Sequence, residues 1–349
     1  MLDTRSPLLK SLKLTGLKAT GSRSLYGPYT SFVAESKAHY LGAANRSPDK
    51  CDADPSAARA INITASRLLA RATSARSILL LYISTDYVFS GTRGDAPYEN
   101  DTPTNPPNLY GQTKLDGESA VLEETADTGL GLVLRVPVLY GHAENNQESA
   151  VNVLLDAVWK AQDKGAQISM DDWALRYPTN TEDVGRVCQD VAVKYLETGS
   201  GRSSLPRILQ FSSEDRYTKY EICELLAEIM GLPLDGMVRN KHGNAPSGGV
   251  QRPYDTHLST RALKELGIDV QTQNFKDWWL VRQAPQATKL ILTAKQETGG
   301  SSSAEIDIDA MRPVVTRLTC NERVFLVAQA QSIWILISST GKVGSQMPA

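Results

Sequence analysis

Three side chains, those of Thr85, Tyr110 and Lys114, have the types and the spacing that carbonyl reduction requires. Tyr110 and Lys114 are four residues apart, so on a helix they share one face. Free tyrosine titrates near pH ~10, and we expect the Lys114 ammonium to favour the phenolate and so permit acid–base work near neutrality. With Thr85 to hold a carbonyl oxygen, the set predicts hydride transfer between a nicotinamide and a C–OH/C=O carbon.

The Tyr–Lys pair is weak by itself, because the chain contains 13 tyrosines and many lysines. A tyrosine packed on a helix beside a solvated lysine is the ordinary alternative. The preceding sequence favours a site, since residues 77–84 form an apolar run typical of a strand buried on both faces, and Thr85 follows it directly.

Helical and strand patterns alternate from about residue 36 to 212, which predicts an α/β fold with a doubly wound, Rossmann-like parallel sheet. Further buried strands are expected at 132–136 and 208–212. Helices are expected from Asp54-Pro55, over about 108–125, 148–164 and 182–197, and after the capping box at 218–221. The buried stripe expected on the first helix is Ala58, Ile61, Ala65, Leu68 and Leu69.

Small and amide residues near the first apolar stretch are further candidates. Ala43 and Ala44 follow that stretch and would let a cofactor approach the backbone, although core packing explains an alanine pair equally simply. Asn62 lies inside the helix that begins at Asp54 and could hydrogen-bond a neighbouring strand, or be structural polarity.

Two arginines are ligand candidates with structural alternatives. Arg135 and Pro137 lie at the end of the 132–136 strand, where an open α/β sheet binds its ligand. A structural ion pair is an equal alternative for Arg135. Arg252 lies in a loop and could hold an anionic or polar substrate, or be a surface charge.

Composition excludes several classes of protein. With 349 residues, 41% hydrophobic and 22% charged, the chain fits a soluble protein of about two domains. A net charge of -2 gives no support for nucleic-acid binding, and no apolar run is long enough to span a membrane. The four cysteines are scattered, which indicates reduced thiols in the cytoplasm, and no residue pattern indicates a metal site.

The Gly-rich phosphate loop of a dinucleotide-binding fold is not found near the N-terminus. The glycines at 16, 21 and 27 have the wrong spacing, and about 20–30 residues are missing before Ala43 relative to complete strand–helix units. We interpret 18–24 as the second strand and its loop, which places Ser22 and Arg23 where a 2′-phosphate is read and favours NADP. The chain is therefore expected to bind a dinucleotide poorly or not at all.

Taken together, these residues resemble the extended short-chain dehydrogenase/reductase family over about residues 15–282. The matching stretches are 84–89, 97–98, 108–114, 135 and 140–141. They are similar to the branch that contains dTDP-4-dehydrorhamnose reductase and the regulatory (beta) subunit of methionine adenosyltransferase 2. The stretches 43–49, 176–179, 183–184, 218–221 and 251–253 are closer to the beta subunit.

The resemblance implies a role for each matching residue. Thr85 would hold the carbonyl, Tyr110 would donate the proton, and Lys114 would anchor the phenolate and the cofactor ribose. The residues implied to contact NADP are Ser22, Arg23, Ala43, Ala44, Tyr110, Lys114, Arg135 and Pro137. Those implied to contact substrate are Asp86, Arg176 and Arg252.

The implied function is that of a regulatory, NADP-binding subunit whose partner is the catalytic subunit of methionine adenosyltransferase. The alternative is an NADPH-dependent reductase of a nucleotide-linked keto sugar, and a third possibility is an inactive fragment of either. Whether the chain is an enzyme stays open, because the triad is retained while the phosphate loop is missing.

The expected organisation has three parts. Residues 1–141 would form the nucleotide-binding domain with a truncated first unit, and 142–282 a smaller substrate lobe whose strand at 208–212 returns to the sheet. Residues 283–349 depart from the family pattern and are expected to be an atypical tail that is a candidate for disorder. The two atypical ends together suggest a gene-model error or an alternatively spliced product.

Overall fold

A four-stranded parallel sheet lies at the centre of the protein. The computed structural model describes residues 37–244 and 249–282, and the backbone of 327–330 and 333–336. The strand order is β1-β2-β3-β7, and every neighbouring pair is parallel. The strands are β1 (Ala38–Leu41), β2 (Leu79–Thr85), β3 (Gly131–Val136) and β7 (Ile208–Gln210). The predicted parallel sheet and the return of the 208–212 segment to it are confirmed.

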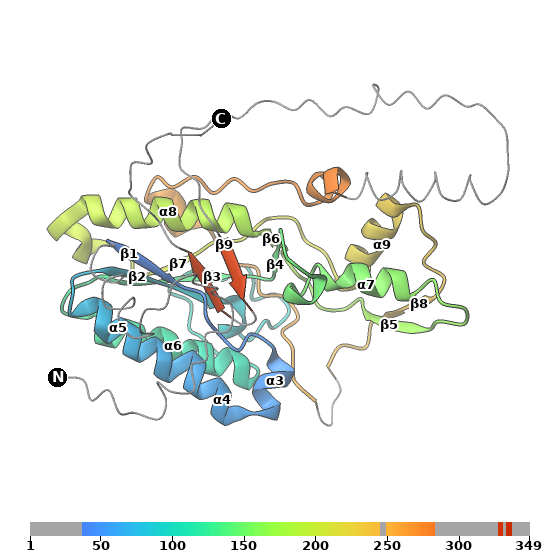
Figure 1. Ribbon diagram of the computed structural model, residues 1–349, viewed down its shortest axis with the longest axis horizontal. Helices are drawn as coiled ribbons and strands as arrows, with labels where there is room; N and C mark the ends of the chain where they lie inside the picture. The colour runs from blue at the N-terminus through green and yellow to red at the C-terminus, as the bar shows by residue number, and fades with distance from the viewer. Residues whose placement is uncertain (1–36, 245–248, 283–326, 331–332, 337–349) are drawn as a thin grey trace, which may run out of the picture.

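Helices cover both faces of this sheet (Figure 1). Helix α8 (Thr181–Thr198) packs on one face, where Leu79 and Leu81 of β2 join its buried residues in one core. Helices α5 (Ser66–Ser74) and α6 (Leu109–Glu124) lie on the other face, toward which Leu80 and Tyr82 point. Because side chains alternate along a strand, the continuous apolar run in β2 supplies both cores.

The first helical segment differs from its expected packing. It consists of α3 (Pro48–Ala53), α4 (Pro55–Arg59), the π-helix η1 (Ala60–Ala65) and α5. Ile61 and Leu68 are 37% and 44% exposed, so the predicted apolar stripe is wrong at these positions. Ala58 is buried as predicted, and the other buried positions are small or polar, namely Asn62, Ser66, Ala70 and Thr73. They allow a close approach to α6, where a Cβ on Gly117 would lie 2.5 Å from the Asn62 carbonyl oxygen.

A second core holds the lobe on the right of Figure 1. Helix α7 (Val153–Lys160) packs against α9 (Lys219–Met230) around residues such as Val158, Leu226 and Phe275. The capping box that opens α9 is confirmed, with Thr218 and Glu221 bonded reciprocally. Two further pairs of strands are β4 (Leu139–Tyr140) with β6 (Thr179–Asn180) and β5 (Ile168–Asp171) with β8 (Met237–Asn240). The remaining short helices are η2 (Asp86–Val88), η3 (Asn146–Glu148), η4 (Gly199–Ser204) and α10 (Arg261–Glu265).

The chain crosses between the two cores more than once. Helix α8 and the apolar residues Ala262 and Leu263 pack with the sheet, although they follow the expected boundary after residue 141. The division at that boundary remains a prediction. Farther along the chain, β9 (Val327–Ala330) and β10 (Ile333–Leu336) pair antiparallel. No helix in the described ranges is both long and apolar enough to cross a membrane. Ser22, Arg23 and the glycines at 16, 21 and 27 lie outside the described residues.

Candidate functional site

Strand β2 delivers Thr85 to the carboxyl edge of the sheet. The residue is 5% exposed, and its hydroxyl donates to Asp86 Oδ1 at 3.0 Å while accepting from the Tyr87 amide at 3.2 Å. These two bonds fix the direction of the hydroxyl as the chain leaves the strand. Thr85 is therefore a pre-oriented polar group at the edge where an open parallel sheet binds its ligand.

Helix α6 places Tyr110 and Lys114 beside that edge. Its N-cap is Asn108, whose Oδ1 accepts from the Gly111 amide at 2.9 Å, so the helix begins just before Tyr110. A side chain at position 111 would lie 2.1 Å from the Tyr87 carbonyl oxygen, so only glycine permits this close contact. The predicted helix over about 108–125 is confirmed, and it brings Tyr110 to the Thr85 end of β2.

Tyr110 is held as a neutral phenol. Burial raises its pKa above the usual value near 10, the nearby Asp86 charge adds to the rise, and hydrogen bonding by Thr85 opposes it. The expected shift toward the phenolate is not found, because the Lys114 amine is directed to strand β2. At neutral pH the Tyr110 hydroxyl thus keeps its proton, with Thr85 as its neighbour, and its role as a proton donor remains a prediction.

Lys114 is buried against the middle of β2. It is 2% exposed, its Nζ donates to the Ile83 carbonyl at 2.8 Å, and the same atom lies 3.9 Å from the centre of the Tyr82 ring. Burial lowers the pKa of Lys114 to about 7, although Glu118 on the next turn of the helix acts in the opposite direction. The amine therefore loses its charge far more readily than a solvated lysine.

Asn62 connects the loop after β1 to helix α6. Its Oδ1 accepts from the Asn45 amide at 2.8 Å, and its Nδ2 donates to Thr113 Oγ1 at 2.9 Å. The residue is fully buried, so these bonds replace those that water would make. Asn62 thus positions the loop that carries Ala43 and Ala44 against the helix that carries Tyr110.

Arg135 forms the structural ion pair that the sequence left open. Its Nε and Nη2 donate to the two oxygens of Glu118 at 3.0 and 2.7 Å, and Ser84 donates to the same carboxylate. Both charged residues are almost fully buried. Pro137 is also buried at the end of this strand, and the role of this turn in holding a cofactor remains a prediction.

Asp86 and Arg176 both lie near Tyr87. The Tyr87 ring contacts that of Tyr110 edge-on, at 5.7 Å between centroids, and the Arg176 guanidinium lies 6.0 Å from the Tyr87 ring centre. Burial raises the pKa of Asp86, which accepts hydrogen bonds from Thr85 and from Thr256. Asp86 therefore contacts Thr85 and Arg176 lies near Tyr87, while the substrate-binding roles of both remain predictions.

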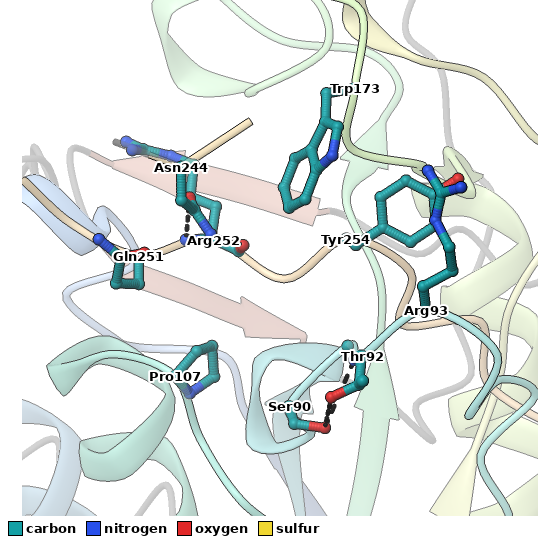
Figure 2. Close-up of a pocket in the computed structure, with 10 residues that line it drawn as sticks. Ser90, Thr92, Arg93, Pro107, Trp173, Asn244, Gln251, Arg252 and Tyr254 are labelled. Carbon is teal, nitrogen blue, oxygen red and sulfur yellow. Dashed lines mark hydrogen bonds between the residues drawn. The ribbon is translucent and has the colours of Figure 1, made fainter. Parts of the chain in front are cut away.

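Arg252 lines a pocket of about 390 Å³ beside the α6 N-terminus (Figure 2). Its guanidinium is paired with Asp49 at 2.8 Å, and its backbone is clamped by the amide side chain of Asn244. The rings of Trp173 and Tyr254 lie 5.1 Å apart across the pocket wall. Arg176 donates to the carbonyl of Pro253, the residue that follows Arg252, at 3.4 Å.

Sequence reasoning missed three residues of the site. Tyr87 connects Tyr110 to Arg176, Glu118 neutralises Arg135, and Lys219 adds a cation to the lobe side. The signal for Glu118 was present, since it follows Lys114 by four residues on one helix face. No sequence signal assigns Tyr87 or Lys219 to the site, because the two residues are far apart along the chain.

Comparison with known proteins shows the family and the fold of this chain. The family described as RmlD substrate binding domain matches residues 33–278. The beta subunit of methionine adenosyltransferase 2 from Rattus norvegicus is 39% identical over 230 residues, which cover 66% of this chain and 65% of the length of that relative. A dTDP-4-keto-6-deoxy-D-glucose reductase from Streptomyces niveus is 32% identical over 220 residues, covering 63% of this chain and 69% of that protein.

A solved structure has the same fold. The dTDP-4-dehydrorhamnose reductase from Bacillus anthracis, crystallised with NADP, has a TM-score of 0.57 and 20% identity to this chain. The match covers 70% of this chain and 78% of that one. At this identity the likeness establishes the fold, and the site must be argued from the residues described above.

Proposed function

Because the chain belongs to the RmlD substrate-binding domain family, we propose that it is a regulatory subunit of methionine adenosyltransferase. The observation that carries the proposal is the 39% identity to the rat beta subunit over 230 residues. The partner is then the catalytic subunit of that synthetase, in the cytoplasm. The retained reductase fold serves as a scaffold and a ligand-binding module.

We propose that this fold suits a nicotinamide dinucleotide as its cofactor, and more specifically NADP. The described residues fit its nicotinamide half, since Ala43 and Ala44 offer little bulk after β1, Lys114 lies in the second turn of α6, and Pro137 follows β3. When bound, the nicotinamide supplies or accepts a hydride. Tyr110 and Thr85 would hold the oxygen of the reacting carbon.

Association with the catalytic subunit tests the main proposal. The full chain, carrying an affinity tag, is mixed with purified catalytic subunit and analysed by pull-down and size-exclusion chromatography. We expect a stable complex that elutes earlier than either protein. Two separate peaks at micromolar concentrations would contradict the proposal. A parallel fluorescence titration with NADPH measures cofactor affinity independently, and a tight result would also overturn the expectation of weak binding.

The second candidate is a reductase of a nucleotide-linked keto sugar. The observation that favours it is the arrangement of Tyr110 as a neutral donor beside the oriented Thr85 hydroxyl, which suits protonation of a carbonyl oxygen as hydride arrives. A purely regulatory protein has no need of this arrangement.

Oxidation of NADPH in the presence of a dTDP-linked 4-keto sugar tests the second candidate. Tyr110→Phe should abolish turnover if the candidate is correct. Tyr195→Phe is the matched control, because this residue belongs to α8 and its hydroxyl donates to the Pro206 carbonyl rather than to a residue of the site. A wild-type rate equal to the background without enzyme would exclude this candidate.

A further inference from the structure

The two edges of the parallel sheet differ in how their backbone groups are satisfied. At one edge, the Val133 amide of β3 donates to the Arg207 carbonyl at 2.9 Å. Alternate residues of a parallel strand bond to the same neighbour, so the next residue, Ile208 of β7, directs its backbone outward. Its carbonyl accepts from Asn100 Nδ2 at 3.2 Å. A loop side chain therefore covers this edge, as is usual for the end strand of a sheet.

The opposite edge, formed by β1, leaves two residues without such partners. The Leu79 amide of β2 donates to the Lys37 carbonyl at 3.1 Å, so Ala38 and Tyr40 direct their backbone N–H and C=O groups away from β2. Within the ranges that the structure describes, these outward groups have no hydrogen-bond partner. Tyr40 is only 7% exposed, so water has little access, and unpaired backbone groups there are costly.

Strand β10 lies where a fifth strand would stand (Figure 1, red). Cα atoms of β10 lie within 8 Å of those of β1. Neighbouring strands of one sheet are about 4.8 Å apart, whereas strands two positions apart, or in two stacked sheets, are about 10 Å apart. The distance therefore places β10 directly beside β1, while its ladder in the structure is the antiparallel one with β9.

The composition of β10 suits this position. Its four residues are Ile333, Trp334, Ile335 and Leu336, all β-branched, aromatic or aliphatic, with no charge, proline or glycine to weaken strand pairing. In an antiparallel pair, alternate residues direct their backbone groups away from the partner. With β9 on one side, β10 thus has backbone donors and acceptors of its own on the other.

We propose that β10 adds to the parallel sheet beside β1 and bonds to the outward backbone groups of Ala38 and Tyr40. The partner of this edge is then a strand of the same chain, held by the main-chain bonds with which extended peptides bind to sheet edges. Because β1 leads into the loop of Ala43 and Ala44, the added strand also supports that loop. The inference goes beyond the proposed function and requires neither the cofactor nor the synthetase partner.

Hydrogen exchange of the full chain, resolved to single residues by mass spectrometry with electron-transfer fragmentation, tests the pairing. The amides of Ala38 and Tyr40 report the edge, and those of His39 and Leu41, which face β2, are the internal reference. In the wild type we expect the two edge amides to exchange at least about tenfold more slowly than in an unfolded chain. Exchange at the unfolded rate would overturn the inference.

Ile335→Pro removes a backbone donor from the middle of β10 and disfavours its pairing. It should accelerate exchange of the Ala38 and Tyr40 amides by about tenfold or more and leave those of His39 and Leu41 unchanged. Ser302→Pro is the matched control, because it adds a proline to the same part of the chain outside β9 and β10. Its exchange should equal that of wild type. Equal edge protection in Ile335→Pro and wild type would show that another segment covers β1, against the proposal.

A milder variant keeps the test decisive if Ile335→Pro does not fold. Ile335→Gly retains the amide but weakens the strand, and it should accelerate exchange of the edge amides severalfold. Unchanged exchange would count against β10 as the partner. Every sample is also measured after tenfold dilution and by size-exclusion chromatography. Edge protection that disappears on dilution, together with a dimer peak, would assign the edge to a second copy and overturn the inference, whereas protection that persists in a monomer supports it.

Discussion

Two buried arginines, Arg135 in the sheet and Arg176 in the lobe, have opposite surroundings. Arg135 is 2% exposed and grips both oxygens of Glu118. Arg176 is 5% exposed, and its hydrogen bonds within the described ranges go to the backbone carbonyls of Leu175 and Pro253. The two side chains are buried to almost the same extent, but their ionic partners differ. The comparison teaches that the partner of a buried cation, rather than its depth, decides how much that cation contributes to the stability of the fold.

Removal of the sheet arginine should have the largest effect on stability. Arg135→Met leaves Glu118 buried and without its cation, and we expect the free energy of unfolding to fall by about 3–5 kcal/mol in urea denaturation. The double variant Arg135→Met with Glu118→Leu should recover most of this loss, because no buried charge then remains. A loss below about 1 kcal/mol in the single variant would show that the ion pair does not hold the sheet.

The buried lysine of α6 should make stability depend on pH. The pKa of Lys114 is lowered to about 7 by burial, while in the unfolded chain a lysine titrates near ~10.4. Between these values the unfolded state binds the extra proton, so the free energy of unfolding rises with pH. The rise attributable to Lys114 from pH 7 to pH 9 should be about 2 kcal/mol, and Lys114→Met should lack it.

Lys276→Met is the control for that measurement, since Lys276 is 44% exposed and paired with Glu228 at the surface. Its stability should follow the wild-type pH profile. If the free energy of unfolding of Lys114→Met changes with pH in parallel with that of wild type, the Lys114 amine is charged in the folded protein. The contrast between the buried charges of this protein would then not hold.

Removal of the lobe arginine should have the smallest effect on stability. Arg176→Met loses two carbonyl contacts but also relieves an unpaired buried charge, so the free energy of unfolding should change by no more than about 1 kcal/mol in either direction. The measurement is urea denaturation without added anions. A loss as large as that in Arg135→Met would mean that Arg176 serves the fold, and the comparison would fail.

The elements that carry the site were predictable because their signals are local. The run at 77–84 became β2, and Asn108 caps α6 just before Tyr110. The capping residues Asp54 and Thr218 were also confirmed. Apolar runs and caps act within one or two turns of the chain, so they can be read without knowing the partners of each element.

The face of the first helix was not predictable in the same way. Its apolar residues Ile61 and Leu68 are exposed, while Asn62 and Ser66 are buried. The π-helix at 60–65 and the close contact with Gly117 of α6 set that face. A periodicity argument assumes that apolar residues point inward, and it fails where two helices approach closely enough to prefer small side chains.

The sequence alone determined which residues stand at the ends of the parallel strands and at the start of α6, because strand and helix formation depend on neighbours in the chain. The tertiary structure alone decided their electrostatic states. It paired Arg135 with Glu118, left Arg176 without an ion pair to any carboxylate in the part of the chain that the structure describes, raised the pKa of Tyr110 and lowered that of Lys114. These outcomes depend on burial and on charges brought together from distant parts of the chain, which no local pattern encodes.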